Sequence, residues 1–307
     1  MRFFLAGVSF FLFSGPALAD PAPSPASPLA ADQVFFVETL RGVSGSRTNQ
    51  AALDLGLDYA RIKYPYGMVN LLDPGQSAVE YRSRLPITDL EKILQVEQQS
   101  GVKSGEKITL VAMDGKTAPA TVASFAYLGN SPSTVLVAAI LKLKTPDAQM
   151  TGQRGLALRG SVKLKPNPRI QLQPQEKIAP ELSDRLFALA VPPERLGQTL
   201  TDIRVIPARL DASDKIYYFV SYWHHPQGAY DLEDMQSAGS LFRVEGEKIV
   251  DLNLPADLEV KAVWDLNGDE KPEILGTAGD GAQVCHRLYS WDGKNFTLIK
   301  EGLCAGY

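Results

Sequence analysis

The spacing of hydrophobic positions in the N-terminal half of the chain first follows a helical period. Apolar residues recur at three- and four-residue steps over 49–61, which predicts a helix there. A second helix is predicted to begin at Thr88, where Glu91 stands three residues later and completes a capping box. This helix is expected to end near Ser100 and Gly101, because glycine favours helix termini.

After Gly105 the pattern changes to runs rich in Val, Ile, Thr and Leu, separated by turn residues such as Asp114 and Gly115. Such runs are typical of strands. The predicted strands are 107–113, 120–128, 134–144 and 160–164. Residues 33–165 are therefore expected to form an α+β domain that contains a β-meander.

Four prolines interrupt the polar stretch 166–181, at positions 166, 168, 174 and 180. Proline lacks the N–H group that a helix interior or a central strand needs, so this stretch is predicted to be a linker. Residues 182–307 have an almost entirely β pattern. The predicted fold class is thus α+β, with a mixed N-terminal domain followed by a mostly antiparallel β domain.

The C-terminal domain contains two similar stretches, 241–252 and 288–299. In each, an apolar strand runs into a turn made by an acidic residue and a glycine, and a second apolar strand returns. Comparable segments precede both. A repeat of roughly 40–50 residues with about four strands is typical of a propeller-like blade. Two ordinary hairpins that share their turn chemistry are the alternative.

The N-terminus carries a targeting pattern. Arg2 precedes an apolar run over 3–13, and Ala-Leu-Ala follows at 17–19, so residues 1–19 are predicted to be a secretory signal peptide. A retained anchor is the alternative. The Pro-, Ala- and Ser-rich residues 20–32 predict an extended tether. No later stretch approaches the roughly 20 apolar residues of a membrane helix. A periplasmic or extracellular protein is expected, with no membrane span after cleavage.

Charge and cysteine content restrict the class of partner and the cellular compartment that we expect. The formal net charge is −4 and the Lys and Arg residues are not clustered, which argues against nucleic acid as a partner. The only two cysteines are Cys285 and Cys304. In an oxidising compartment they are predicted to form a structural disulfide. A redox pair is disfavoured because the Cys-x-x-Cys spacing is absent.

The most specific chemical feature is an oxygen-rich loop at 265–273. Short acidic or amide side chains stand at its positions 1, 3 and 5, and a longer one stands at position 9; they are Asp265, Asn267, Asp269 and Glu273. Hard oxygen donors of this kind are the ligands that Ca²⁺ selects, and the carbonyl of Lys271 is a further candidate ligand. A solvated acidic turn that binds nothing is the alternative.

The run 263–275, Val-Trp-Asp-Leu-Asn-Gly-Asp-Glu-Lys-Pro-Glu-Ile-Leu, resembles the loop of FG-GAP/VCBS repeats, the calcium-binding blade motif of integrin-α-type propellers. The similarity extends over about residues 258–300. It implies a calcium ion held by the side chains of the four loop residues named above and by the carbonyl of Lys271. One departure is Glu270, which stands where these loops usually have glycine.

Two other places in the C-terminal domain carry weaker chemical signals. His224 and His225 lie beside an acidic run, and two histidines with a carboxylate can bind zinc; the acidic residues are Asp231, Glu233 and Asp234. Adjacent strand residues point to opposite faces, so a polar hairpin tip is the preferred interpretation. The second place holds Asp211, Ser213 and Asp214, which lack the full calcium spacing and are expected to bind nothing.

Together these features predict an exported, non-catalytic protein with a structural Ca²⁺ loop, serving as a binding or interaction module for a protein or glycan partner. The sequence lacks the nucleophile-elbow and zinc-hydrolase motifs. The alternative is a secreted hydrolase that uses Asp and Glu residues between the two domains. An envelope assembly factor is a third interpretation that the residues do not separate from the first.

Overall fold

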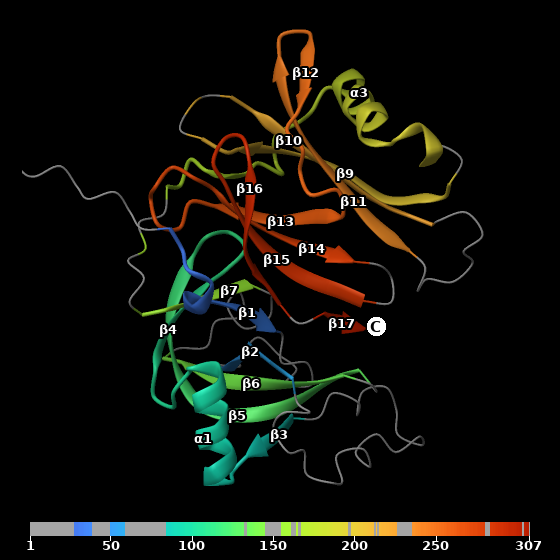
Figure 1. Cartoon of the computed structure of the whole chain (residues 1–307). Helices are drawn as coiled ribbons and strands as arrows, with labels where there is room; N and C mark the ends of the chain where they lie inside the picture. The colour runs from blue at the N-terminus through green and yellow to red at the C-terminus, as the bar shows by residue number, and fades with distance from the viewer. Residues whose placement is uncertain are drawn as a thin grey trace, which may run out of the picture.

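Figure 1 shows the chain as a computed structural model. The structure describes residues 28–38, 50–58, 84–131, 134–144, 155–160, 164, 167–195, 198–211, 213, 215–225, 235–279, 283–302 and 304–306. The helices are η1 (Ala31–Gln33), α1 (Leu90–Ser100), α3 (Pro180–Ala190) and η5 (Pro193–Arg195). The strands of the N-terminal part are β1 (Val34–Glu38), β2 (Gln50–Asp58), β3 (Arg84–Ile87), β4 (Lys107–Val111), β5 (Thr117–Ser131), β6 (Thr134–Leu143) and β7 (Gly155–Arg159).

The N-terminal part is a closed antiparallel barrel. Its strands follow the order β5-β4-β7-β1-β2-β6, and β6 pairs with β5 to complete the ring. β3 pairs with residues 125–128 in the C-terminal part of β5. Alternate residues of each strand point inward, as in β1, where Phe35 and Val37 enter the barrel core. The predicted meander is present in β4, β5 and β6. Helix α1 packs against the barrel through Val96, which is fully buried.

The helix predicted over 49–61 is wrong, because residues 50–58 form strand β2. The same residues contain a second period: Ala51, Leu53 and Leu55 alternate into the barrel core, while Ala52 faces outward. β2 lies between β1 and β6, and both of its edges are hydrogen-bonded. Pairing on two sides thus overrides the helical propensity of Ala and Leu.

The start of one predicted helix shifts by one residue, and one predicted strand lies elsewhere. The N-cap of α1 is Asp89 rather than Thr88, and its carboxylate accepts the N–H groups of Glu91 and Lys92. An aspartate at this position also complements the positive end of the helix dipole. The strand predicted over 160–164 is wrong at its described residues, since Gly160 is a turn residue and Leu164 lies in no strand; the strand of this region is β7, which ends at Arg159. β7 is fixed by its pairing with β4 and β1.

The C-terminal part consists of two antiparallel sheets, each built around four consecutive strands. The first C-terminal sheet contains β8 (Gln171–Leu172), β9 (Leu200–Arg209), β10 (Tyr217–His224), β11 (Gln236–Glu245) and β12 (Lys248–Asp251). The second C-terminal sheet contains β13 (Leu258–Trp264), β14 (Glu273–Gly279), β15 (Gln283–Trp291), β16 (Phe296–Glu301) and β17 (Ala305–Gly306). Both predicted hairpins are present, as β11–β12 and β15–β16. The assignment of these two hairpins to propeller-like blade repeats stays a prediction.

The stretch predicted as a linker contributes ordered elements to the first C-terminal sheet. β8 pairs with β9, and α3 begins at Pro180, a residue suited to the first helical turn. Leu186 and Ala190 of α3 pack on one face of the sheet, where Tyr222 and other buried side chains receive them. The prediction of an almost entirely β C-terminal half therefore missed this helix.

The molecule is layered, and the second C-terminal sheet lies in the middle (Figure 1). One of its faces, including Val263 and Ile274, packs against the first C-terminal sheet. The opposite face, including Leu275 and Leu288, packs against the outer surface of the barrel. The barrel strand β1 serves both cores, because its alternate residue Phe36 joins this second contact. The sheet is thus buried on both faces.

The two C-terminal sheets approach each other closely at Gly239 of β11. A Cβ atom at this position would lie 2.0 Å from the carbonyl oxygen of Leu258, which no side chain can accommodate. The N–H of Gly239 also donates to the carbonyl of Ala256 across the contact. Glycine is therefore required here by the distance between the two backbones.

Residues 1–19 and most of the predicted tether lie outside the described residues, so the signal peptide and the tether stay predictions. Within the described ranges, none of the helices has the length and apolar character that crossing a membrane requires.

We expect the barrel and the two C-terminal sheets to unfold in one transition, because they share the cluster around Leu275 and Leu288. All three tryptophans, Trp223, Trp264 and Trp291, lie in the C-terminal part, and Trp264 belongs to its contact with the barrel, so their fluorescence monitors that part and the contact. Far-UV circular dichroism monitors both parts. In urea, the two signals should give the same midpoint.

The variant Leu288→Ala should lower the free energy of unfolding by about 2–5 kcal/mol in both signals. Leu94→Ala, at a position that is 55% exposed on α1, is the control and should change it by less than about 0.5 kcal/mol. Two separate transitions, or a loss seen by fluorescence only, would contradict the shared core.

Candidate functional site

The predicted calcium loop connects β13 to β14 at one end of the second C-terminal sheet. Trp264 ends β13 and is paired with Glu273, the first residue of β14, so the two strands hold both ends of the loop. Three of its oxygen-bearing side chains are almost completely buried: Asp265 is 1% exposed, Asn267 4% and Glu273 2%. These three side chains are therefore enclosed, unlike those of an ordinary acidic turn, while Glu270 and Lys271 at the tip of the loop are exposed.

The carboxylate of Asp265 organises the turn. Its Oδ1 accepts the N–H groups of Gly268 and Asp269, at 2.7 Å and 3.1 Å, and its Oδ2 accepts the N–H of Glu270 at 3.1 Å. Three successive backbone donors thus point at one side chain. The first residue of the loop determines the path of the next five.

The other predicted ligands bind the backbone in the same way. Asn267 Oδ1 accepts the N–H of Asp269 at 3.1 Å, and Asp269 Oδ1 accepts the N–H of Lys271 at 3.0 Å. Glu273 Oε2 reaches back to the N–H of Leu266 at 2.8 Å. The loop is therefore held by side chain to backbone hydrogen bonds along its whole length.

The backbone adopts a left-handed conformation at two positions, Gly268 with φ of 76° and Glu270 with φ of 64°. Glycine takes such angles easily, whereas a glutamate is strained there. Glu270 is the position at which the resembling calcium loops usually have glycine. The turn thus requires at Glu270 a backbone conformation that glycine adopts more easily.

Burial makes ionisation of the carboxyl groups unfavourable. It raises the pKa of Glu273 to about 8, with further contributions from the negative charges of Asp269 and Asp265. Burial, followed by the charge of Asp269, also raises the pKa of Asp265, although backbone hydrogen bonds oppose this shift. No Lys or Arg side chain of the described part of the chain forms an ion pair with these three carboxylates.

The loop offers oxygen atoms, but they do not converge as closely as a metal centre would require. In the ranges that the structure describes, no three His, Cys, Asp or Glu side chains are gathered in a group that could hold an ion. The chemistry of the donors nevertheless suits Ca²⁺, because carboxylate and amide oxygens are hard ligands. A carboxylate has about four lone-pair sites, so Asp265 keeps acceptor capacity beyond its three backbone partners.

The corresponding loop of the first C-terminal sheet, between β9 and β10, is closed by protein donors instead. Asp211 accepts the N–H of Ser213 at 2.9 Å, the hydroxyl of the same serine, and the hydroxyl of Tyr217 at 2.6 Å. Burial alone would raise the pKa of Asp211, but the hydrogen bonds from Ser213 and Tyr217 outweigh it, and the pKa is lowered. Asp214 lies outside the described residues.

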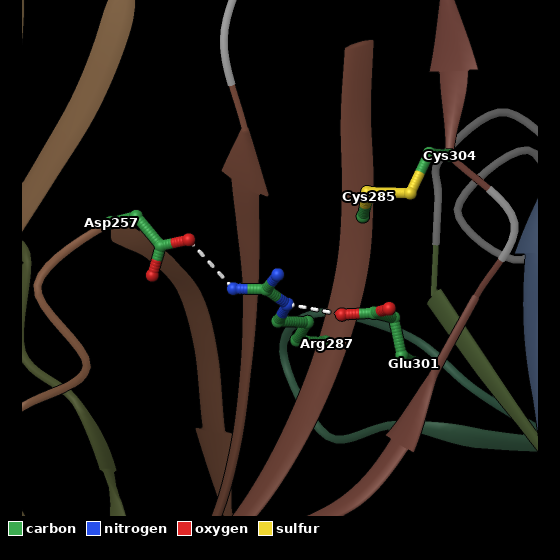
Figure 2. The surroundings of a disulfide bond; sticks show 5 residues. All are labelled: Asp257, Cys285, Arg287, Glu301 and Cys304. Carbon is green, nitrogen blue, oxygen red and sulfur yellow. Dashed lines mark hydrogen bonds and ion pairs between the residues drawn. A yellow bond between two sulfur atoms is a disulfide. The ribbon is translucent and has the colours of Figure 1, made fainter.

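The predicted disulfide between Cys285 of β15 and Cys304 is present, with a Cα–Cα distance of 4.1 Å. Figure 2 shows it beside Arg287, which donates to Asp257 at 2.7 Å and to Glu301 of the edge strand β16. The covalent link and the ion pairs attach the end of the chain to the second C-terminal sheet.

The weaker histidine candidates lie at the end of β10, and His225 follows the strand with its backbone N–H donating to the carbonyl of Thr199. His224 ends β10, is 3% exposed, and has its Nδ1 at 2.9 Å from Gln198 Oε1. The acidic run that the zinc interpretation required, 231–234, lies outside the described residues. His286 is buried in β15 with its ring 5.7 Å from that of Phe36.

We expect removal of the disulfide, in the variant with Cys285→Ser and Cys304→Ser, to lower the free energy of unfolding by about 3 kcal/mol. The closed loop spans 19 residues, and its cross-link restricts the unfolded chain. Urea unfolding with and without a thiol reductant measures this. The reductant should reproduce the loss in the wild type and have no effect on the variant; equal stability of the two proteins would contradict the prediction.

The variant Tyr217→Phe tests the closed loop of the first sheet. It should lower the free energy of unfolding by about 1–2 kcal/mol at pH 7, because ionised Asp211 loses a donor. The folded pKa of Asp211 lies below 3.8, so its stabilisation is complete above that pH and is lost as the pH falls through the folded value. The difference between the two proteins should therefore shrink under acid, as urea unfolding at pH 7 and below pH 3.8 would show. An unchanged difference would contradict the role of Asp211.

Comparison with known proteins leaves the resemblance of the loop as a prediction. No family model matches the chain, and neither a curated protein nor a solved structure matches it.

Proposed function

We propose that this protein is an exported, non-catalytic binding module in which the loop 265–273 holds a structural Ca²⁺ ion. The observation that carries the proposal is the burial of Asp265, Asn267 and Glu273 in a single turn, where the carboxyl groups of Asp265 and Glu273 form no ion pair with a described Lys or Arg. Buried charges normally have such a partner or coordinate a metal.

A divalent cation would remove the electrostatic cost of the loop. Asp265, Asp269 and Glu273 repel one another, and burial strengthens the repulsion by excluding water. Ca²⁺ would be held by these carboxylates, the amide oxygen of Asn267 and the carbonyl of Lys271, which would have to close around the ion, because no three acidic side chains of the described residues are gathered without it. It would supply a positive charge that favours the ionised carboxylates and no reaction chemistry.

The first C-terminal sheet supports this assignment by contrast. Its loop satisfies Asp211 with hydroxyl donors from Ser213 and Tyr217, which lower the pKa of that carboxyl group. In the second sheet the carboxyl groups of Asp265 and Glu273 are shifted in the opposite direction. The two loops occupy the same place in similar meanders. In the first sheet, hydroxyl donors of the protein offset the cost of burying the charged carboxylate, whereas in the second sheet they do not.

The alternative of a secreted hydrolase requires catalytic carboxylates between the two parts of the chain. The contact that the structure describes there is apolar, with Leu156 and Leu158 of the barrel packed among Ala262, Leu275 and Leu288 of the second sheet. This packing favours the binding module over the hydrolase.

Calcium should raise the melting temperature of the purified protein relative to the same protein in chelator. At a hundredfold excess over the dissociation constant, one ion that binds only the folded state adds about 2.7 kcal/mol to the free energy of unfolding. Thermal unfolding and calorimetric titration with CaCl₂ measure the shift and the stoichiometry, which should be one. Identical melting curves with no binding heat would reject the calcium proposal.

The variants Asp265→Ala and Asp269→Asn should each abolish the calcium response. Asp265→Ala also removes three hydrogen bonds of the turn, so Asp269→Asn serves as the milder change if the first variant does not fold. Asp211→Asn is the matched control, because it alters the corresponding loop of the other sheet and should leave the calcium response intact. A response lost equally in the control would contradict the assignment to loop 265–273.

A further inference from the structure

A polar row crosses one face of the second C-terminal sheet. Glu273 of β14 is paired with Ser290 of β15, and Ser290 is paired with Thr297 of β16. Residues paired directly across antiparallel strands lie on the same face. The next residues on this face, Leu275 and Leu288, belong to the apolar contact with the barrel. The polar row therefore marks the place where that apolar contact ends.

A cavity of about 370 Å³ lies over the row. Glu273, Ser290 and Thr297 line it together with Asp269, Lys271 and Asp292, and the segment 28–31 forms part of its wall. A volume of this size is in the range of small-molecule sites. The cavity thus combines side chains that are far apart in the sequence, from the loop, the β15–β16 hairpin and the N-terminal segment.

The row contains hydrogen-bonding groups that other described residues do not use. Glu273 is 2% exposed; its Oε2 accepts the N–H of Leu266, and its own backbone N–H also interacts with the carboxyl group. The hydroxyls of Ser290 and Thr297 form no hydrogen bond with a described residue. Ser290 is half-buried and Thr297 is exposed, so both hydroxyls are open to a molecule or to water in the cavity.

The charge of the lining selects a cation. Three acidic residues, Asp269, Glu273 and Asp292, line the cavity against the single ammonium group of Lys271. A positively charged ligand is therefore favoured, and anions are disfavoured. The walls also contain apolar residues, including Leu29 and Ile299, which would contact the hydrocarbon part of a ligand.

We propose that this cavity binds a short linear aliphatic diamine or polyamine. One ammonium group would lie against Glu273 and Asp269, the methylene chain would lie on Ile299 and Leu29, and the hydroxyl of Thr297 would accept from a second ammonium. Adjacent strands are about 4.8 Å apart, so the row from β14 to β16 extends over roughly 10 Å, which an extended amine can follow.

This inference is independent of the calcium proposal, although both involve Asp269 and Glu273. Calcium bound by these carboxylates would compete with the amine. Binding of the amine is therefore measured in chelator. A protein that binds the amine without responding to calcium would reject only the calcium proposal, and the reverse result would reject only this one.

The test is calorimetric titration of the full chain with putrescine, compared with 1,4-butanediol, an uncharged molecule of the same chain length. We expect saturable binding of putrescine at one site and at least about tenfold weaker binding of the diol. Raising the salt concentration should weaken putrescine binding, because screening reduces the attraction of exposed charges. Equal binding of the two molecules, or no saturable binding of putrescine, would overturn the proposal.

Variants locate the site. Glu273→Gln and, as a milder surface change, Asp292→Asn should each weaken putrescine binding, the first by at least about tenfold. If Glu273→Gln does not fold, Asp292→Asn and Thr297→Ala carry the test. Glu247→Gln is the matched control, since Glu247 occupies the turn of the corresponding β11–β12 hairpin; it should change binding by less than about twofold. Unaltered binding in every cavity variant would place the amine elsewhere and overturn the assignment.

Discussion

Burial of the second C-terminal sheet on both faces is the constraint on which the rest of the structure depends. One face packs against the first C-terminal sheet and the other against the barrel, so strands β13 to β15 consist almost entirely of buried residues. The barrel strand β1 completes this arrangement by sending Phe35 into the barrel and Phe36 toward the sheet. Apolar burial of this kind supplies most of the favourable free energy of folding.

The same burial determines the chemistry of the loop 265–273. The loop begins and ends on two buried strands, and the surrounding layers exclude water from Asp265 and Glu273. Carboxyl groups that would be unremarkable at a surface acquire raised pKa values there. The first C-terminal sheet has a comparable loop but less need of a cation, because Tyr217 donates its hydroxyl to Asp211.

The edge of the second C-terminal sheet is where the burial becomes incomplete. Lys300 of β16 donates to the carbonyls of Ala31 and Val34 and thereby ties the edge strand to the start of the barrel. Its Nζ also lies 4.5 Å from the centroid of the Phe35 ring. Beside this contact the layers separate enough to leave the cavity over Glu273. The proposed calcium loop and the proposed amine site thus share one structural origin, the boundary of a doubly buried sheet.

The sequence by itself determined the features that depend on neighbouring residues. It located the oxygen-rich loop, the two acidic-glycine hairpin turns and the β4–β6 meander. It also predicted the disulfide, because Cys285 and Cys304 are the only cysteines in the sequence. It misassigned 50–58, where helical and alternating periods coexist and only the pairing of β2 with β1 and β6 selects the strand. The tertiary structure alone decided that Glu273, Ser290 and Thr297 form a row over a cavity. Strand register and the packing of layers bring these residues together, and neither is encoded in the local spacing of residues along the chain.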